Sequence, residues 1–211
     1  FARLRNQPLY DKSGLHFGFH IGINSYNFSM DLKDLSEVNN IFGVESEALP
    51  GYNINIISNL RLTEHLDLRF TPGFAATVRK IHFDLIDPIR DERRIVSRQI
   101  ESSYVQFPVH LKFKSVRVDN YRIYLMGGLR YCNDLASRAK VVDDNLFKLQ
   151  RHTGDYEFGF GADFYFEYFK FSPQIRASWG LTNLLVQDGT LPVEAFDAIR
   201  NRAILVNFTF E

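Results

Sequence analysis

The sequence predicts an all-β fold: an eight-stranded antiparallel up-and-down transmembrane β-barrel with four long extracellular loops and short periplasmic turns. Three observations lead to this prediction. Apolar and polar residues alternate over segments of about ten residues, the length that a tilted strand needs to cross a bilayer. The connections between these segments alternate between long and short. The polar positions of the segments hold both charged residues and many glycines.

The clearest alternation covers residues 156–181. Every even position from Tyr156 to Tyr168 is apolar or aromatic, and every odd position from Phe169 to Leu181 is apolar as well. A period of two predicts strands with one apolar face, and the change of phase at the junction is the one that a tight hairpin requires. Each run is about twice the usual length of a soluble strand, roughly five or six residues.

Six further segments alternate in the same way. The first runs from Leu15 to Met30, and its apolar phase slips near Asn24–Ser25, which predicts a bulge. The remaining segments are Tyr52–Leu62, Leu66–Val78, Tyr104–Lys114, Tyr121–Tyr131 and Ile204–Phe210. Proline has no N–H for the strand ladder, so bulges are expected at the three prolines inside strand patterns, namely Pro72, Pro108 and Pro173.

The predicted connections give the topology. The long ones are Asp31–Gly51, Lys80–Arg98, Asn133–Gly154 and Asn183–Arg202, and the short ones lie at Thr63–His65, Val116–Asn120 and Tyr168–Phe169. Outer-membrane barrels have short periplasmic turns and longer extracellular loops. The even strand number then places both termini in the periplasm. Residues 1–13 are expected to form an N-terminal periplasmic lead-in, and residues 14–211 the barrel.

Composition excludes little. The chain has 25 basic and 25 acidic residues, so its charge implies no attraction to nucleic acid. The mean hydropathy of −0.20 is compatible with a barrel, because polar lumen residues offset lipid-facing ones. Cys132 is the only cysteine, which excludes an intramolecular disulfide. The sequence shows neither a transmembrane-helix pattern nor a signal peptide, and leaves open whether a signal was cleaved.

Alternation alone does not say which face points inward, because a soluble lipocalin-like barrel has its apolar face inside. Two further features favour an apolar exterior: the rhythm of the connections and the alternating C-terminal stretch ILVNFTFE. Glycines on the polar face suit a crowded interior, and they are Gly18, Gly22, Gly73, Gly128, Gly159, Gly161 and Gly180.

A lumen of this kind would hold a network of charges. Eight strands enclose room for side chains but not for an aqueous channel. Buried charges need partners, so we expect a mixed-sign network that plugs the barrel and blocks ion flow. The expected members are Arg61, Asp67, Arg69, Arg79, Glu101, Lys112, Arg122, Arg130, Glu157, Asp163, Glu167 and Arg176.

Two groups of residues are candidates for further chemistry. His16, His20 and His110 lie on polar faces, as a lipid-modifying barrel enzyme would require. No nucleophile motif and no third metal ligand accompany them, so histidines satisfied within the lumen are the favoured interpretation. A second group could contact lipopolysaccharide phosphates or an acidic partner, or form a solvated hairpin tip, and comprises Arg90, Arg93, Arg94 and Arg98.

Several segments resemble PorT-family (also called SprT) outer-membrane proteins. The resemblance rests on HFGFHIGIN, PGYNINIISNLRL, LDLRFTPGF, ESSYVQFPVHLKFKS and FGFGADFYFEYFKFSPQIRASWGLTNLL, which cover most of the chain. That family is associated with the type IX secretion system of Gram-negative bacteria that glide or secrete proteases. The resemblance implies an outer-membrane barrel, without enzymatic activity or cofactor, that assembles or operates the secretion machinery with its other components. It carries over no catalytic or ligand residue. The alternatives are a stand-alone adhesin or envelope-stabilising barrel, and a lipid-modifying enzyme.

Overall fold

The computed structural model describes residues 6–32, 41–86, 93–136, 150–185 and 196–211. Within these residues, no helix is both long enough and apolar enough to cross a membrane. A single turn of 3-10 helix, η1 (Tyr10–Lys12), precedes the strands. The strands are β1 (Leu15–Leu32), β2 (Ile41–Ala48), β3 (Pro50–Arg61), β4 (Leu66–Phe70), β5 (Gly73–Ile86), β6 (Arg93–Lys114), β7 (Tyr121–Asp134), β8 (His152–Tyr165), β9 (Lys170–Gly180) and β10 (Phe196–Phe210).

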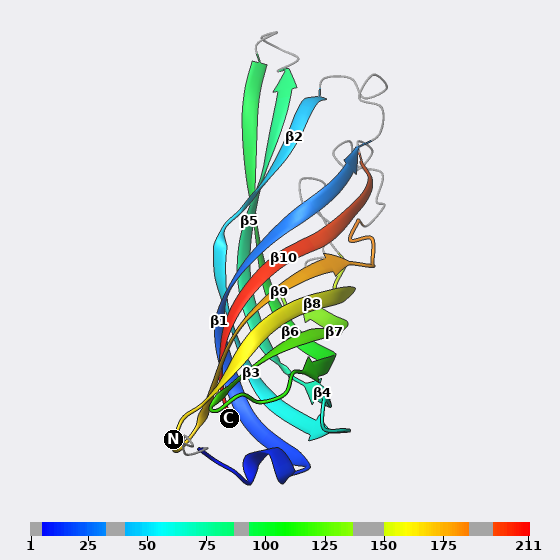
Figure 1. Cartoon of the computed structure of the whole chain (residues 1–211). Coiled ribbons are helices and arrows are strands. Elements are labelled where there is room, and N and C mark those ends of the chain that lie inside the picture. Colours follow the sequence, from blue (N-terminus) through cyan, green and yellow to red (C-terminus); the bar gives the residue numbers. More distant parts are fainter. Residues whose placement is uncertain (1–5, 33–40, 87–92, 137–149, 186–195) are drawn as a thin grey trace.

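The strands form one closed antiparallel sheet (Figure 1). Apart from strands that continue one another, neighbours in sequence pair side by side. β1 closes the ring by pairing with β10 on one side and with β3 on the other. β2 and β3 are successive parts of one strand, as are β4 and β5, so the ring has eight strands. The eight-stranded up-and-down barrel predicted from the sequence is therefore confirmed.

The expected bulges are absent from the described pairings at the three prolines. Pro108 opposes Arg130 and Pro173 opposes Phe208 in unbroken register. Pro72 lies in the gap between β4 and β5, and the register of β6 against these two strands is the same on either side. The β8–β9 pairing is also interrupted beside Pro173, between the Gly161–Gln174 and Phe164–Phe171 pairs, and continues in the same register. Each missing N–H thus interrupts the ladder without adding a residue.

The bulge predicted near Asn24–Ser25 is also wrong. β1 pairs with β10 without a shift from Phe19 to Asp31. Tyr26 and Phe28 are buried, like the even-numbered residues before them. The strand therefore keeps its phase. Its inward face changes from polar to aromatic side chains. In the sequence alone, that change resembles a shift in the phase of the apolar positions.

Three strands continue well beyond the rest of the barrel (Figure 1). The β5–β6 ladder runs without interruption to the Ile86–Arg93 pair, and β2 pairs with the same stretch of β5. We call residues 41–48, 79–86 and 93–100 the extension. The expectation that 31–51 and 80–98 are loops is wrong for these residues. Their charges resemble those of a loop, but along β5 the apolar residues Ile81, Phe83 and Leu85 keep the period of two.

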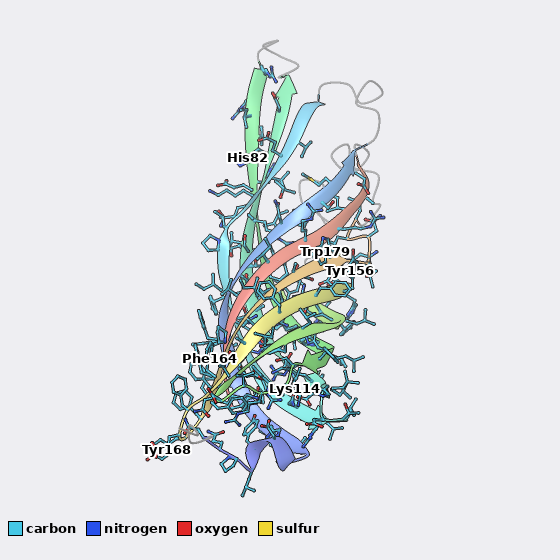
Figure 2. The ribbon with its side chains drawn as sticks, viewed as in Figure 1. His82, Lys114, Tyr156, Phe164, Tyr168 and Trp179 are labelled. Atoms are coloured by element: carbon cyan, nitrogen blue, oxygen red, sulfur yellow. The ribbon has the colours of Figure 1, made fainter. Side chains whose placement is uncertain are left out.

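Apolar side chains face outward. Phe17, Ile56 and Ile123 are 66%, 66% and 63% exposed, whereas the alternating polar side chains are buried. Figure 2 shows aromatic residues at two levels of the wall, with Tyr156 and Trp179 on β8 and β9 and Tyr168 in the turn below. A sheet with an apolar exterior belongs in lipid, so the lipocalin-like alternative is excluded.

Candidate functional site

The barrel interior holds a connected set of ion pairs, with Glu157 of β8 at its centre. The glutamate Oε2 lies 2.6 Å from His110 Nε2 and 3.0 Å from Arg176 Nη1, and its Oε1 lies 2.8 Å from Arg130 Nη1. Odd positions of β8 point inward, which places this carboxylate among side chains from β6, β7 and β9. Glu157 is fully buried.

Arg130 extends this cluster toward the extension. Its guanidinium lies 2.6 Å from Asp155 Oδ2 and donates to the hydroxyl of Tyr26 at 2.8 Å. Above it, Arg79 donates to Asn201 and Tyr104, at 2.9 Å in each case. These contacts join opposite walls of the barrel, because Tyr26 and Asn201 come from β1 and β10.

A second cluster lies toward the end where η1 and the C-terminus meet, which we call the terminal end (Figure 1). Lys112 Nζ lies 2.9 Å from Asp163, and Lys114 lies 2.5 Å from Asp67. The last residue, Glu211, is bound by Arg69 and Lys170 at 2.6 and 2.7 Å. The final carboxylate side chain therefore ties β4 and β9 together across the lumen.

The N-terminal segment closes the terminal end. Asp11 accepts hydrogen bonds from Arg117 and Arg122, and Tyr10 donates to Glu211 at 2.7 Å. Burial alone would raise the pKa of Asp11, but the two guanidinium groups outweigh it and hold that pKa below its usual value. Asn6 also bonds the β8 carbonyl of Tyr165. The segment is fixed by charge-assisted contacts to the barrel.

Every carboxylate within these two clusters has a cationic partner. Removing one partner of a buried pair leaves an uncompensated charge and typically costs about 3–5 kcal/mol. The arrangement therefore holds the side chains in place, and an eight-stranded barrel has room for little more than such side chains. Chemically, it can bind the walls together.

The predicted members of the charge network divide into three groups. Those buried in the lumen or at its terminal end are Asp67, Arg69, Arg79, Lys112, Arg122, Arg130, Glu157, Asp163 and Arg176. Arg61 is half-buried at the rim and donates to the carbonyl of Asp11. Glu101 and Glu167 are exposed, so their expected place in the lumen is wrong. Glu101 is at an outward odd position of β6, and Glu167 is in the β8–β9 turn.

The predicted network omits four charged residues of the two clusters. Lys114 and Lys170 lie on the polar face that the alternation gives to β6 and β9, and Asp155 shares the inward phase at the start of β8. Strand parity applied up to the strand ends therefore predicts these three. Glu211 carries no such signal, because its partners lie on strands distant in sequence.

Two of the histidines share the lumen and the third lies apart from them. His20 of β1 and His110 of β6 are both buried near Arg69 and Arg176, and His110 also pairs with Glu157. His16 instead stacks on Tyr10, with 4.0 Å between ring centroids. Among the described residues, no group of three His, Cys, Asp or Glu could hold a metal ion. The structure does not bring these three histidines together into one site.

The arginines predicted near a hairpin tip lie on the extension, except that Arg90 is outside the described residues. Arg93 binds the carboxylate of Asp84, while Arg94 and Arg98 are exposed. The hydrogen bond from Arg93, together with its charge, lowers the pKa of Asp84. On the face of Asp84 and Arg93, which is opposite to that of Arg94 and Arg98, His82 lies 2.7 Å from the hydroxyl of Ser97 and 3.2 Å from Glu47. The outward face of the extension is thus polar, unlike the wall below it.

Similar chains occur among solved structures, and the likeness to OprG supports the fold. OprG of Pseudomonas aeruginosa is 12% identical, with a TM-score of 0.51 over 94% of this chain and 93% of that chain. Neisserial surface protein A is 10% identical (TM-score 0.46, 93% and 98% covered). Ail of Yersinia pestis, the attachment invasion locus protein, solved with the heparin analogue sucrose octasulfate, is 11% identical (TM-score 0.44, 94% and 98% covered).

Comparison with curated proteins yields no match. The family model described as an outer membrane protein beta-barrel domain matches residues 3–186. That match spans most of the chain and agrees with the closed sheet, the apolar exterior and the charged interior. The chain belongs to the outer-membrane β-barrel domain family.

Proposed function

We propose that this protein is a non-conducting, non-enzymatic outer-membrane barrel that serves as an accessory or assembly component of type IX secretion. The observation that carries the proposal is the ion-paired interior: Glu157, Asp163 and Glu211 each bind cations from other strands. A barrel closed in this way acts through its surfaces rather than through a pore. The part of the proposal that names type IX secretion rests on the resemblance to PorT-family proteins.

The extension supports a docking role. It places three strands beyond the lipid-facing wall, with the polar residues Glu47, His82 and Ser97 on its outward face. We infer that this end is extracellular and that both termini are periplasmic, because long connections of outer-membrane barrels face outward. Arg94 and Arg98 would then be available to lipopolysaccharide phosphates or to an acidic surface of another secretion component.

A deletion strain tests the secretion role. The account expects loss of type IX cargo from the culture medium, and recovery with the wild-type gene. A complementing variant with the β5–β6 hairpin shortened between Lys80 and Gln99 should insert in the membrane and yet fail to restore secretion. The opposed residues Lys80 and Gln99 can be joined by a short turn without changing register. Normal secretion by the deletion strain would refute the role.

A stand-alone adhesin is the second candidate, and the exposed Arg94 and Arg98 favour it. An R94S/R98S double variant separates the two, because an adhesin would lose attachment to polyanionic surfaces while secretion stayed intact. The enzymatic alternative predicts altered lipid A or phospholipid profiles in the deletion strain. Unchanged profiles are expected here, since His20 and His110 are buried in the lumen, away from lipid.

A further inference from the structure

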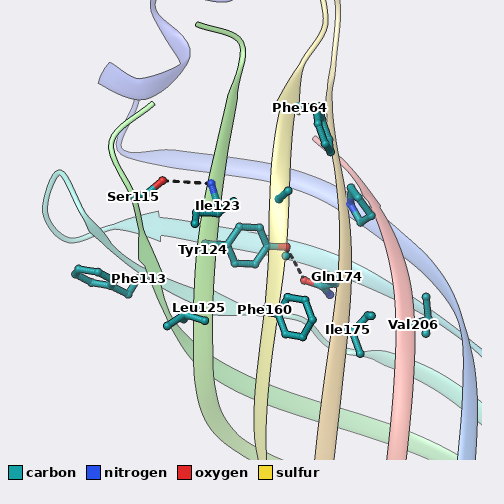
Figure 3. A pocket seen from close by; sticks show the side chains of 13 residues that line it. Phe113, Ser115, Ile123, Tyr124, Leu125, Phe160, Phe164, Gln174, Ile175 and Val206 are labelled. Carbon is teal, nitrogen blue, oxygen red and sulfur yellow. Dashed lines mark hydrogen bonds between the residues drawn. The ribbon is translucent and has the colours of Figure 1, made fainter. Parts of the chain in front are cut away.

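The outer wall over β6 to β10 contains a groove of about 700 Å³ (Figure 3). One side of the groove is a row of outward side chains, each paired with the next across neighbouring strands. This row consists of Phe113, Leu125, Phe160, Ile175 and Val206. Phe164 stands on the other side of the groove.

Small residues make the floor over β8 and β9. These are Ala162 and Pro173, which project little beyond the sheet, while the same row continues with the large Ile123 on β7 and with Ser115 after β6. Because the surrounding positions carry large side chains, the missing volume at Ala162 and Pro173 leaves a hollow over these two strands. The flanking residues are strongly exposed, with Phe113 at 58% and Leu125 at 64%. The groove is therefore continuous with the apolar belt that faces lipid.

Behind the floor, two lumen side chains satisfy each other. The Tyr124 hydroxyl donates to Gln174 Oε1 at 3.0 Å, and Figure 3 shows this contact reaching across β8. Glycine is required at position 161, since a Cβ there would lie 2.5 Å from the Tyr124 Oη. The Tyr124 hydroxyl proton is thus committed to Gln174. The Ser115 hydroxyl donates to the Val116 carbonyl and accepts from the Ile123 N–H, and the other lining side chains are apolar. The groove suits a ligand that needs no polar partner there.

We propose that this groove binds the acyl chain of a phospholipid. Its volume is in the range of small-molecule pockets, about 300–1,000 Å³, and its mouth opens on hydrocarbon. Ser115 and Phe164 adjoin the last residues of β6 and β8, so the groove lies in the leaflet at the terminal end. Under the proposed orientation this is the periplasmic leaflet, which consists of phospholipid.

A chain in the groove gains contacts that a flat wall cannot give. On the open belt, an acyl chain touches protein along one side only. In the groove it also meets the side chains of both flanking rows, and the dispersion attraction of each added atom pair, about 0.1–0.2 kcal/mol, accumulates along the chain. The site therefore retains one lipid against exchange with the surrounding bilayer.

Photo-crosslinking tests the site. The full chain is reconstituted in vesicles of phosphatidylethanolamine and phosphatidylglycerol that contain phosphatidylethanolamine with a diazirine in its acyl chain. Labelled peptides are quantified by mass spectrometry. Labelling around Ala162 should exceed that around Ser58, an outward residue of β3, by about tenfold, or about 1.4 kcal/mol.

Two variants give the control. Ala162→Trp fills the groove and should reduce its labelling to the level of the rest of the wall, whereas Ser58→Trp should leave groove labelling unchanged. Circular dichroism verifies that both variants fold. Even labelling around the barrel, or full labelling in Ala162→Trp, would overturn the proposal. So would strong labelling in vesicles with none in native outer membranes, which would show that a protein covers the groove. None of these outcomes depends on secretion.

Discussion

Replacing Glu157 with glutamine tests the energetic role of the central ion cluster. The substitution keeps the shape of the side chain and removes its charge. Arg130 retains Asp155 as a partner at 2.6 Å, whereas Arg176 loses the carboxylate that lies 3.0 Å away. The cost of breaking a buried pair, about 3–5 kcal/mol, then applies mainly to Arg176. Glutamine still accepts hydrogen bonds, so we expect a loss of about 3 kcal/mol.

Reversible unfolding from vesicles in urea measures this loss. The chain has one tryptophan, Trp179, which stacks on Tyr156 at the outer wall with 5.4 Å between centroids. Its fluorescence therefore reports transfer of β8 and β9 from lipid to water. A loss of about 3 kcal/mol lowers the folding equilibrium constant by more than a hundredfold.

Glu167→Gln serves as the matched control, because Glu167 is exposed in the β8–β9 turn. Its free energy of unfolding should change by less than about 0.5 kcal/mol, as is usual for surface substitutions. If Glu157→Gln and Glu167→Gln had equal effects, the ion cluster would contribute nothing specific to stability, and the reasoning would be wrong.

The remaining predictions concern the ends of the barrel and its wall. Gly128→Ala should strongly reduce the folded fraction on insertion into vesicles, because the added Cβ would lie 2.0 Å from the Val109 carbonyl oxygen. Gly14→Ala is the control and should be neutral, since its Cβ meets no atom within 4 Å. The Asp84–Arg93 pair should restrain the end of the extension above the ordinary aspartate pKa of about 3.9. This restraint should be lost as the pH falls through the lowered pKa of Asp84. A spin label at Arg94→Cys should then become more mobile in acid, whereas Asp84→Asn should be mobile at every pH. Arg117 and Arg122 likewise lower the pKa of Asp11, so either acid or Asp11→Asn should expose residues 6–13 to protease. Unchanged cleavage would contradict the contacts described.

The sequence was sufficient to predict the barrel because alternation is a local property. Each of the two runs joined at Tyr168–Phe169 shows its face and its length without knowledge of the rest of the chain. The inward charges follow from the same parity, which is why Arg69, Lys112 and Glu157 were found. Parity failed where the chain leaves the membrane: at Glu167 the strand has already turned, and the phase no longer applies.

Other features depend on long-range contacts that no local pattern shows. Tyr26 and Phe28 point inward because they pack beside the cations Arg130 and Arg79, with Arg79 4.1 Å from the Phe28 ring. Local hydrophobicity predicted the opposite face. The frequent charges of the extension are typical of a loop, yet β2 adds a third strand from a distant part of the chain. Its pairing could not be read from either segment alone.

Current through planar bilayers that contain the purified protein tests the central claim most directly. The account predicts no steady conductance above that of protein-free bilayers, since lumen side chains such as Arg130 of β7 and Tyr26 of β1 are bonded to one another across the interior. Bilayers with a known porin verify the assay. Stable, stepwise conductance of the wild-type barrel would contradict the filled lumen and the docking function that rests on it.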